Sequence, residues 1–268
     1  MLLMTSRIPY NIQKPFRSIR PQTSKIIFLS FEGSVTEEEY FYRVSEIFDE
    51  IKSKIQFISV AEDAVHTAPK CRTTDQSRML SESRPKQLVE KIDWFKKEKN
   101  DIYQFSKYPD DEFWIVTDVD QNWSDQIIDA QKGTTYKEEW NEVITECQEK
   151  GYNYAISNPF FEVWLLLHHD DPSEKDKSFG VSDEHPYEKT DHFRKRLCNL
   201  EVPLKNKKHI NPSDYDCNKI KIAVHRAKEL HIDKQDLCPK YFATTVYLLL
   251  EKIFAMLPEN PSEKYDDE

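Results

Sequence analysis

The sequence has little glycine and no paired cysteines, and these shortages exclude several kinds of site. Only 4 of its 268 residues are glycine, so it contains neither a Walker-type phosphate loop nor a GxGxxG dinucleotide fingerprint. The 5 cysteines are odd in number, widely spaced and without a CxxC pair, so neither a disulfide framework nor a zinc knuckle is indicated. We therefore expect free thiols and no ATP hydrolysis by this chain alone.

Long apolar runs and an excess of basic residues are also absent. No window approaches the roughly 20 apolar residues of a membrane-spanning helix, and the N-terminal segment is too polar after Met4 for a signal peptide. We expect a cytoplasmic protein without a membrane partner. The net charge of -10 argues against a protein that coats nucleic acid through a generally basic surface, so any such partner must be gripped locally.

The chain divides into a long core and polar segments. Residues 1–24 are basic and contain proline, and they are predicted to form an arm. Residues 170–186 are predicted to form a flexible loop and residues 259–268 an acidic tail. We expect a catalytic domain at 25–169 and a helical C-terminal region at 187–258 packed on it. The hydrophobic content of 38% suffices for a substantial core at this length.

Strands and helices alternate through the first half of the chain. The predicted strands are 25–31, 55–61, 112–120 and 152–157, and the predicted helices are 36–52, 85–99, 134–149, 158–169, 188–199, 212–231 and 239–257. Thr36 is expected to cap the first helix, and Gly151 is expected to end the third. This order indicates an α/β fold, with a mostly parallel sheet flanked by helices and a helical C-terminal part.

Three acidic residues follow the predicted strands. Glu32 comes directly after the first strand, and Asp118 and Asp120 end the third. Catalytic groups gather at the carboxyl ends of strands in such sheets. In extended backbone Asp118 and Asp120 point to one side, where they can hold a hard cation, while Val119 points into the packing. A strand-end aspartate is also a common turn former, so the partner Glu32, as a third ligand or general base, is what favours a metal site.

Other side chains are weaker candidates. Glu162 lies among apolar residues and either pairs with a cation, accepts backbone hydrogen bonds at a helix start, or binds a second metal. Tyr215 is a candidate for stacking on a base. The cations predicted to contact a nucleic-acid backbone are Arg194, Lys205, Lys207, Lys208, Lys219 and Arg226. The eight histidines show no metal-ligand spacing, so a histidine-based site is not indicated.

Three motifs together resemble the RloB family, which includes the abortive-infection component AbiLii. They are IIFLSFEGSVTEEEYF, FWIVTDVDQNW and ISNPFFEVWLLLHH, and the resemblance extends through Lys205 and Lys219 to the last helix. Phe31 departs from the family pattern, in which a smaller residue often precedes the glutamate. The resemblance implies a Toprim-like fold, with Glu32 as the acid-base or metal-binding glutamate. It also implies that Asp118 and Asp120 bind Mg²⁺ or Mn²⁺.

The resemblance further implies a role in bacterial antiviral defence, commonly with an ABC-type ATPase as protein partner. Our first hypothesis is a magnesium-dependent nuclease of abortive infection that cleaves DNA or RNA, tRNA included. The alternative is a catalytically silent Toprim scaffold that binds the ATPase, and the net charge of -10 would suit a basic partner. A primase-like enzyme is a third hypothesis, but the zinc or polymerase element expected of it is not visible in the sequence.

Overall fold

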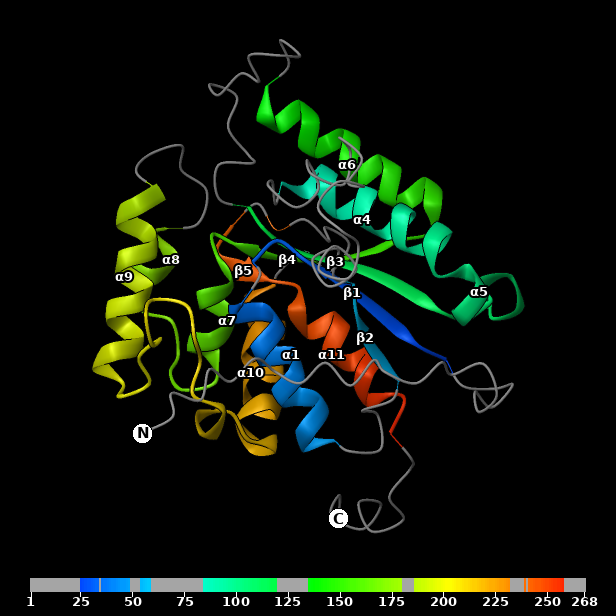
Figure 1. Ribbon diagram of the computed structural model, residues 1–268. Coiled ribbons are helices and arrows are strands. Elements are labelled where there is room, and N and C mark those ends of the chain that lie inside the picture. The colour runs from blue at the N-terminus through cyan, green and yellow to red at the C-terminus, as the bar shows by residue number, and fades with distance from the viewer. Residues whose placement is uncertain are drawn as a thin grey trace, which may run out of the picture.

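The computed structural model contains a five-stranded sheet between two layers of helices (Figure 1). It describes residues 25–33, 35–48, 54–58, 84–119, 135–179, 186–231, 239 and 241–257. Asp120, the predicted basic arm and the predicted acidic tail lie outside these ranges. Within them, the α/β fold with a mostly parallel sheet flanked by helices, which the sequence predicts, is confirmed.

The sheet has the strand order β2-β1-β3-β4-β5. The strands are β1 (Ile27–Phe31), β2 (Ile55–Phe57), β3 (Glu112–Asp118), β4 (Asn153–Asn158) and β5 (Ala243–Thr244). The first four are parallel, and β5 runs antiparallel to β4. The register pairs Phe31 with Val116 and Asp118 with Ser157. The carboxyl ends of β1, β3 and β4 therefore lie along one edge of the sheet, which we call the carboxyl edge.

Helices cover both faces of this sheet. They are α1 (Thr36–Ile47), α4 (Pro85–Glu98), α5 (Asn100–Tyr103), α6 (Tyr136–Lys150), α7 (Phe161–Leu167), α8 (Glu174–Lys177), α9 (Pro186–Asn199), α10 (Cys217–Leu230) and α11 (Val246–Phe254), with 3-10 turns at Phe105–Lys107 and Pro212–Asp214. One face packs against α4 and α6, and the other against α1, α7, α10 and α11 (Figure 1). Burial on both faces explains why β1 and β3 are apolar at successive positions.

The end of the chain differs from the sequence prediction. A single helix was expected at 239–257, but residues 243–244 form β5 and α11 begins only at Val246. The reason is long-range pairing with β4. The backbone N–H of Thr245 donates to the Ile156 carbonyl at 2.8 Å, and the Thr245 hydroxyl accepts from the Ile156 N–H at 2.8 Å. These bonds satisfy backbone groups of β4 that a helix would leave unpaired.

Two further local features bear on the sequence analysis. Gly151 ends α6 with a positive φ of 68°, as predicted for a C-terminal cap. Within 170–186, Ser173 begins the short helix α8 by accepting a hydrogen bond from the N–H of Asp176. In the part of the chain that the structure describes, no helix is long and apolar enough to cross a membrane.

Candidate functional site

Glu32 and Asp118 meet at the carboxyl edge although 86 residues separate them. The backbone N–H of Glu32 donates to the Val116 carbonyl at 3.0 Å, which continues the pairing of β1 with β3. The Glu32 side chain then reaches across the end of β3, where its Oε2 accepts hydrogen bonds from the Asp118 N–H at 3.0 Å and from the Thr117 hydroxyl. Val119 is buried, as the sequence predicts, whereas Asp120 lies outside the described residues.

Glu37 is a further acid at this edge that the sequence analysis did not select. Its carboxylate lies against the Glu32–Gly33 turn, where a Cβ on Gly33 would fall well within 3.0 Å of it. The side chain is buried, with 6% exposure. The pKa of Glu37 is raised to about 7. Burial is the main cause, the negative charges of Glu162 and Glu32 add to the rise, and backbone hydrogen bonds to the carboxylate oppose it. Glu37 therefore shares one electrostatic environment with both of these acids.

The position of Glu37 was visible in the sequence as an acid on an apolar stripe. Glu37, Tyr40, Phe41 and Val44 have the spacing of one helix face, and all four are buried. Acids in the first turn of a helix are also what its dipole favours, and this reading hides the special position of Glu37. An acid on the buried face of a helix is unusual, and that departure from the pattern was the missed indication.

Two cations approach the acids from opposite layers. Glu162, in the first turn of α7, pairs with Arg194 of α9 at 3.2 Å. Burial raises the pKa of Glu162, and the Arg194 charge opposes that rise. On the other face Lys91 of α4 lies near Glu32: burial lowers the pKa of Lys91, and the charge of Glu32 opposes that shift. Of the three alternatives left open for Glu162, the structure thus contains two, the ion pair with a cation and a backbone hydrogen bond at the helix start.

Arg194 is one of three predicted phosphate-contacting cations that make intramolecular contacts. Lys219 donates to the Asp214 carbonyl at 3.0 Å. Arg226 donates to the Leu167 carbonyl at 2.9 Å and pairs with Asp171 at 2.8 Å. Arg194 therefore joins α9 to α7 and Arg226 joins α10 to α7, whereas Lys219 fixes the start of α10 to the turn before it.

The other three predicted cations share one exposed turn, Lys205–Lys208, which we call the lysine turn. Its central residues have positive φ angles, 52° at Asn206 and 66° at Lys207, and Lys205 pairs with His209 in an antiparallel bridge. This geometry is that of a tight hairpin turn. The side chains of Lys205, Lys207 and Lys208 are all exposed.

The lysine turn is attached to the first turn of α1. The Thr36 hydroxyl donates to the Lys208 carbonyl at 2.6 Å. The Glu39 carboxylate accepts from the Ile210 N–H at 3.0 Å and contacts Nδ1 of His209 at 2.7 Å. The prediction that Thr36 caps α1 is wrong, because Val35 occupies the cap position and the Thr36 hydroxyl is used by the turn. Helix α1 thus connects the lysine turn to Glu32.

The sequence model of the RloB-like protein family matches residues 27–253. The chain belongs to the RloB-like family. No curated protein and no solved structure matches it. The matched part runs from β1 into α11 and includes Glu32, Asp118, Asp120 and the lysine turn. The resemblance stated from the three motifs is therefore confirmed at the level of the family.

The residues of this RloB-like protein at the carboxyl edge fit a hard divalent cation in their donor chemistry, because carboxylate oxygens are the ligands that Mg²⁺ and Mn²⁺ prefer. Among the described residues, no group of three or more His, Cys, Asp or Glu side chains is arranged to hold a metal ion. Asp120, the third predicted ligand, lies outside these residues. Glu32 and Asp118 are the two members of the predicted set that the structure brings together.

Tyr215 cannot stack on a base in this RloB-like fold, so that prediction is wrong. Its ring has 1% exposure and packs edge-on against Tyr40 and His168. His168 belongs to the same core: burial lowers its pKa to about 3, and its ring nitrogens contact the Tyr40 hydroxyl at 3.0 Å and the Trp164 carbonyl at 2.9 Å. An aromatic core, with a neutral histidine inside it, supports α1 and α7 from behind the candidate site.

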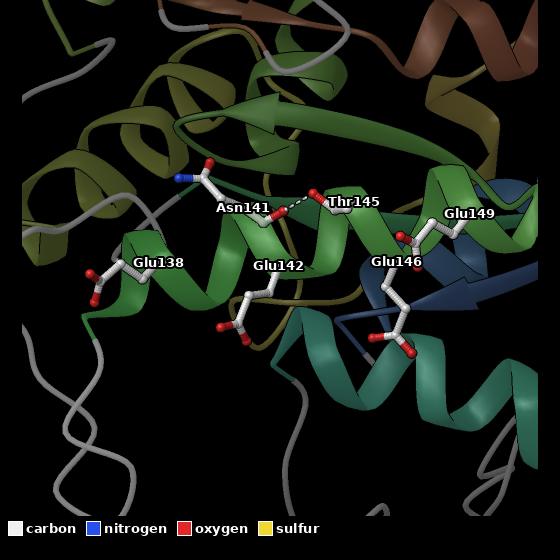
Figure 2. A pocket seen from close by; sticks show the side chains of 6 residues that line it. All are labelled: Glu138, Asn141, Glu142, Thr145, Glu146 and Glu149. Atoms are coloured by element: carbon white, nitrogen blue, oxygen red, sulfur yellow. Dashed lines mark hydrogen bonds between the residues drawn. The ribbon is translucent and has the colours of Figure 1, made fainter.

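A depression on the outer face of α6 is not part of this site. Figure 2 shows its lining side chains, which come from one helix: Glu138, Asn141, Glu142, Thr145, Glu146 and Glu149. The Thr145 hydroxyl donates to the Asn141 carbonyl of its own helix at 2.9 Å. Acids spaced along the outer face of a helix are typical of a solvated surface, and we assign no catalytic role to them.

Proposed function

We propose that this RloB-like protein is a metal-dependent nuclease that hydrolyses phosphodiester bonds of DNA or RNA, tRNA included. The supporting observation is the hydrogen bond between the Glu32 carboxylate and the Asp118 N–H, which joins two of the three predicted acids at the carboxyl edge. In α/β sheets this edge is where catalytic groups collect.

In this proposal Glu32, Asp118 and Asp120 hold Mg²⁺ or Mn²⁺, and Glu162 is a candidate for a second metal. A bound divalent ion would stabilise negative charge on the phosphate oxygens during displacement. The chain's own contribution is orientation. The Asp118 N–H and the Thr117 hydroxyl fix one oxygen of Glu32, and Lys91, on the α4 side of Glu32, binds a phosphate oxygen of the substrate. A fixed carboxylate loses less entropy when it engages its ligand.

The biological setting follows from the family resemblance. We propose that the chain is the effector of an abortive-infection system and acts with an ABC-type ATPase. The scarcity of glycine supports a separate ATPase, because 4 glycines without a phosphate loop leave this chain no recognisable ATP site.

The alternative, a silent Toprim scaffold that binds the ATPase, is favoured by a different observation. The acidic outer face of α6 (Figure 2) would complement a basic surface on a partner. In that case the acids at the carboxyl edge would have no catalytic role, and their substitution would leave the defence phenotype intact.

Cleavage assays separate the two proposals. Purified protein, with and without the ATPase, is incubated with plasmid, single-stranded DNA and total RNA in Mg²⁺ or Mn²⁺. We expect cleavage by the wild type and a loss of at least about 100-fold in Glu32→Gln and Asp118→Asn. Glu98→Gln, at the exposed end of α4, is the control and should cleave like the wild type. Undiminished cleavage by both edge variants would show that the site assignment is wrong.

A further inference from the structure

One aromatic side chain at the carboxyl edge, that of Tyr241, is exposed to solvent. The side chain of Tyr241 is 78% exposed. Among the large hydrophobic side chains that the structure describes, only Ile222, at 44%, is also exposed. Single exposed apolar residues are common on protein surfaces. Tyr241 differs from such a residue in its position and in having the buried residues Pro239 and Phe242 close to it in the chain.

The register of β5 determines where Tyr241 lies. Ala243 pairs with Asn158, the last residue of β4, and β5 runs antiparallel to it. The chain just before β5 therefore runs past the carboxyl end of β4, at the edge that holds Glu32 and Asp118. Neighbouring strands lie about 4.8 Å apart, so the two spacings between β5 and β3 put this segment about 10 Å from the end of β3.

Buried neighbours hold the backbone of Tyr241 in place. Phe242 follows it and has 5% exposure. Pro239 precedes it by two residues, is buried, and accepts a hydrogen bond from the Asn158 amide at 2.8 Å. The ring is thus presented to solvent from a segment attached to β4 on both sides, which is the preorganisation that a stacking surface requires.

The lysine turn provides fixed positive charge at the start of α1, next to the same edge. Its attachment through Thr36 and Glu39 involves hydrogen bonds of 2.6 and 3.0 Å. Lys207 has the left-handed backbone that glycine or asparagine adopts more readily.

We propose that the carboxyl edge binds single-stranded nucleic acid, with an unpaired base stacked on Tyr241 and the phosphate backbone held by Lys205, Lys207 and Lys208. This inference rests on the proposed nuclease function and adds the substrate class, a strand with unpaired bases. Stacking requires an open base face, which a base paired inside a duplex does not offer. Lysines contact phosphates without reading sequence, so the surface binds without strong sequence preference.

A protein partner fits this surface less well. A specific protein interface buries roughly 1,000 Å² or more, whereas a single tyrosine contributes at most about 250 Å². Lysine is also depleted in the cores of protein interfaces. An aromatic ring and a basic turn at one edge of the sheet instead match the combination that single-strand binders use.

The test measures binding by the full-length protein in EDTA, where metal-dependent cleavage is blocked. The probes are a fluorescent single-stranded DNA, a single-stranded RNA and a DNA duplex of equal length. Tyr241→Ala should weaken single-strand binding about 5- to 100-fold, the range for loss of one stacked base. Tyr241→Phe should bind like the wild type, because stacking needs the ring and not the hydroxyl. The control is Ile222→Ala on α10, which removes the other exposed large hydrophobic side chain of the described residues and should leave single-strand binding unchanged.

Two further readouts separate stacking from a merely structural role. A 2-aminopurine in the strand should be quenched by the wild type and by Tyr241→Phe but not by Tyr241→Ala. Replacing Lys205, Lys207 and Lys208 together by glutamine should lower the slope of log affinity against log salt by up to about 2, or about 0.7 for each phosphate contact. Glutamine removes the charge but keeps an unbranched polar side chain, and the turn is held by backbone groups of Lys205 and Lys208, so the turn itself should be preserved.

The inference is overturned by single-strand binding that is unchanged in Tyr241→Ala, or by a Tyr241→Phe variant that binds as poorly as Tyr241→Ala. Lost ATPase binding with unchanged nucleic-acid binding would also overturn it and would make Tyr241 a protein-docking residue. Binding in EDTA is independent of the metal site. If the Tyr241 variants bind as expected but Glu32→Gln still cleaves nucleic acid, the assignment of the metal site is wrong and the proposed binding surface is still supported.

Discussion

Substitution of Gly33 tests whether Glu37 shapes the turn that carries Glu32. A Cβ at residue 33 would fall well within 3.0 Å of the Glu37 carboxylate, so Gly33→Ala must displace a buried side chain. Overpacking of a closed site destabilises by roughly 1–3 kcal/mol, and loss of the hydrogen bond from Gly33 to Glu37 adds to this. We expect Gly33→Ala to destabilise the wild type by about 2 kcal/mol.

The same substitution should be harmless once the carboxylate is gone. Glu37→Ala vacates the space beside residue 33, so Gly33→Ala in that background should cost nearly nothing. It should even stabilise by roughly 0.4–1 kcal/mol through the entropy of the unfolded chain. The double-mutant cycle would then give a coupling energy of about 2–3 kcal/mol between the two positions.

Thermal and urea denaturation measure this cycle. A loss of about 2 kcal/mol corresponds to a fall in Tm of roughly 4–8 °C for a chain of this size. Gly151→Ala is the control: Gly151 has a φ of 68° and no heavy atom within 4 Å of an added Cβ, so it should cost about 1 kcal/mol with or without Glu37. An equal effect of Gly33→Ala in both backgrounds would refute the assignment of this glycine to the Glu37 contact.

Three more predictions follow from the site. The raised pKa of Glu37, about 7, means that the folded protein holds a proton that the unfolded chain releases between pH 4.5 and 7. Stability is therefore lost as pH rises through this window. In urea titrations the free energy of unfolding of Glu37→Gln should be higher than that of the wild type by up to about 3 kcal/mol at pH 8, and no higher at pH 4.5. Lys91→Met should lower kcat/KM for cleavage by about 100-fold, with Lys97→Met at the far end of α4 as the unaffected control; equal activity of the two variants would remove Lys91 from the site. Glu39→Ala should release the lysine turn, and an unchanged rate of tryptic cleavage after Lys205–Lys208 would show that Glu39 does not hold it.

Much of the fold could be predicted because it depends on local pattern. The apolar runs of β1 and β3 could be read from residues 25–31 and 112–120, since a strand buried on both faces is apolar at successive positions. Gly151 could be assigned as a helix end because few other residues adopt a positive φ. The acids Glu32 and Asp118 were candidates from their place after strands, because parallel strands align their carboxyl ends.

Long-range contacts limited the rest of the prediction. The apolar spacing of 239–257 suited a helix, but the open edge of β4 recruits Ala243–Thr244 as a strand, and local spacing contains no information about that edge. Tyr215 was predicted to stack on a base, but in the structure its ring packs against Tyr40 and His168. Three of six predicted phosphate contacts proved to make intramolecular bonds with groups distant in sequence, Arg194 with Glu162 among them.

The sequence by itself therefore determined the alternation of strands and helices, the membership of the RloB-like family and the order in which acids follow strands, because each depends on neighbouring residues. Only the tertiary structure decided that Glu37 lies against Gly33, that Thr36 and Glu39 hold the lysine turn, and that Tyr241 stands at the carboxyl edge. These contacts depend on strand register and helix packing, which join residues up to 172 positions apart.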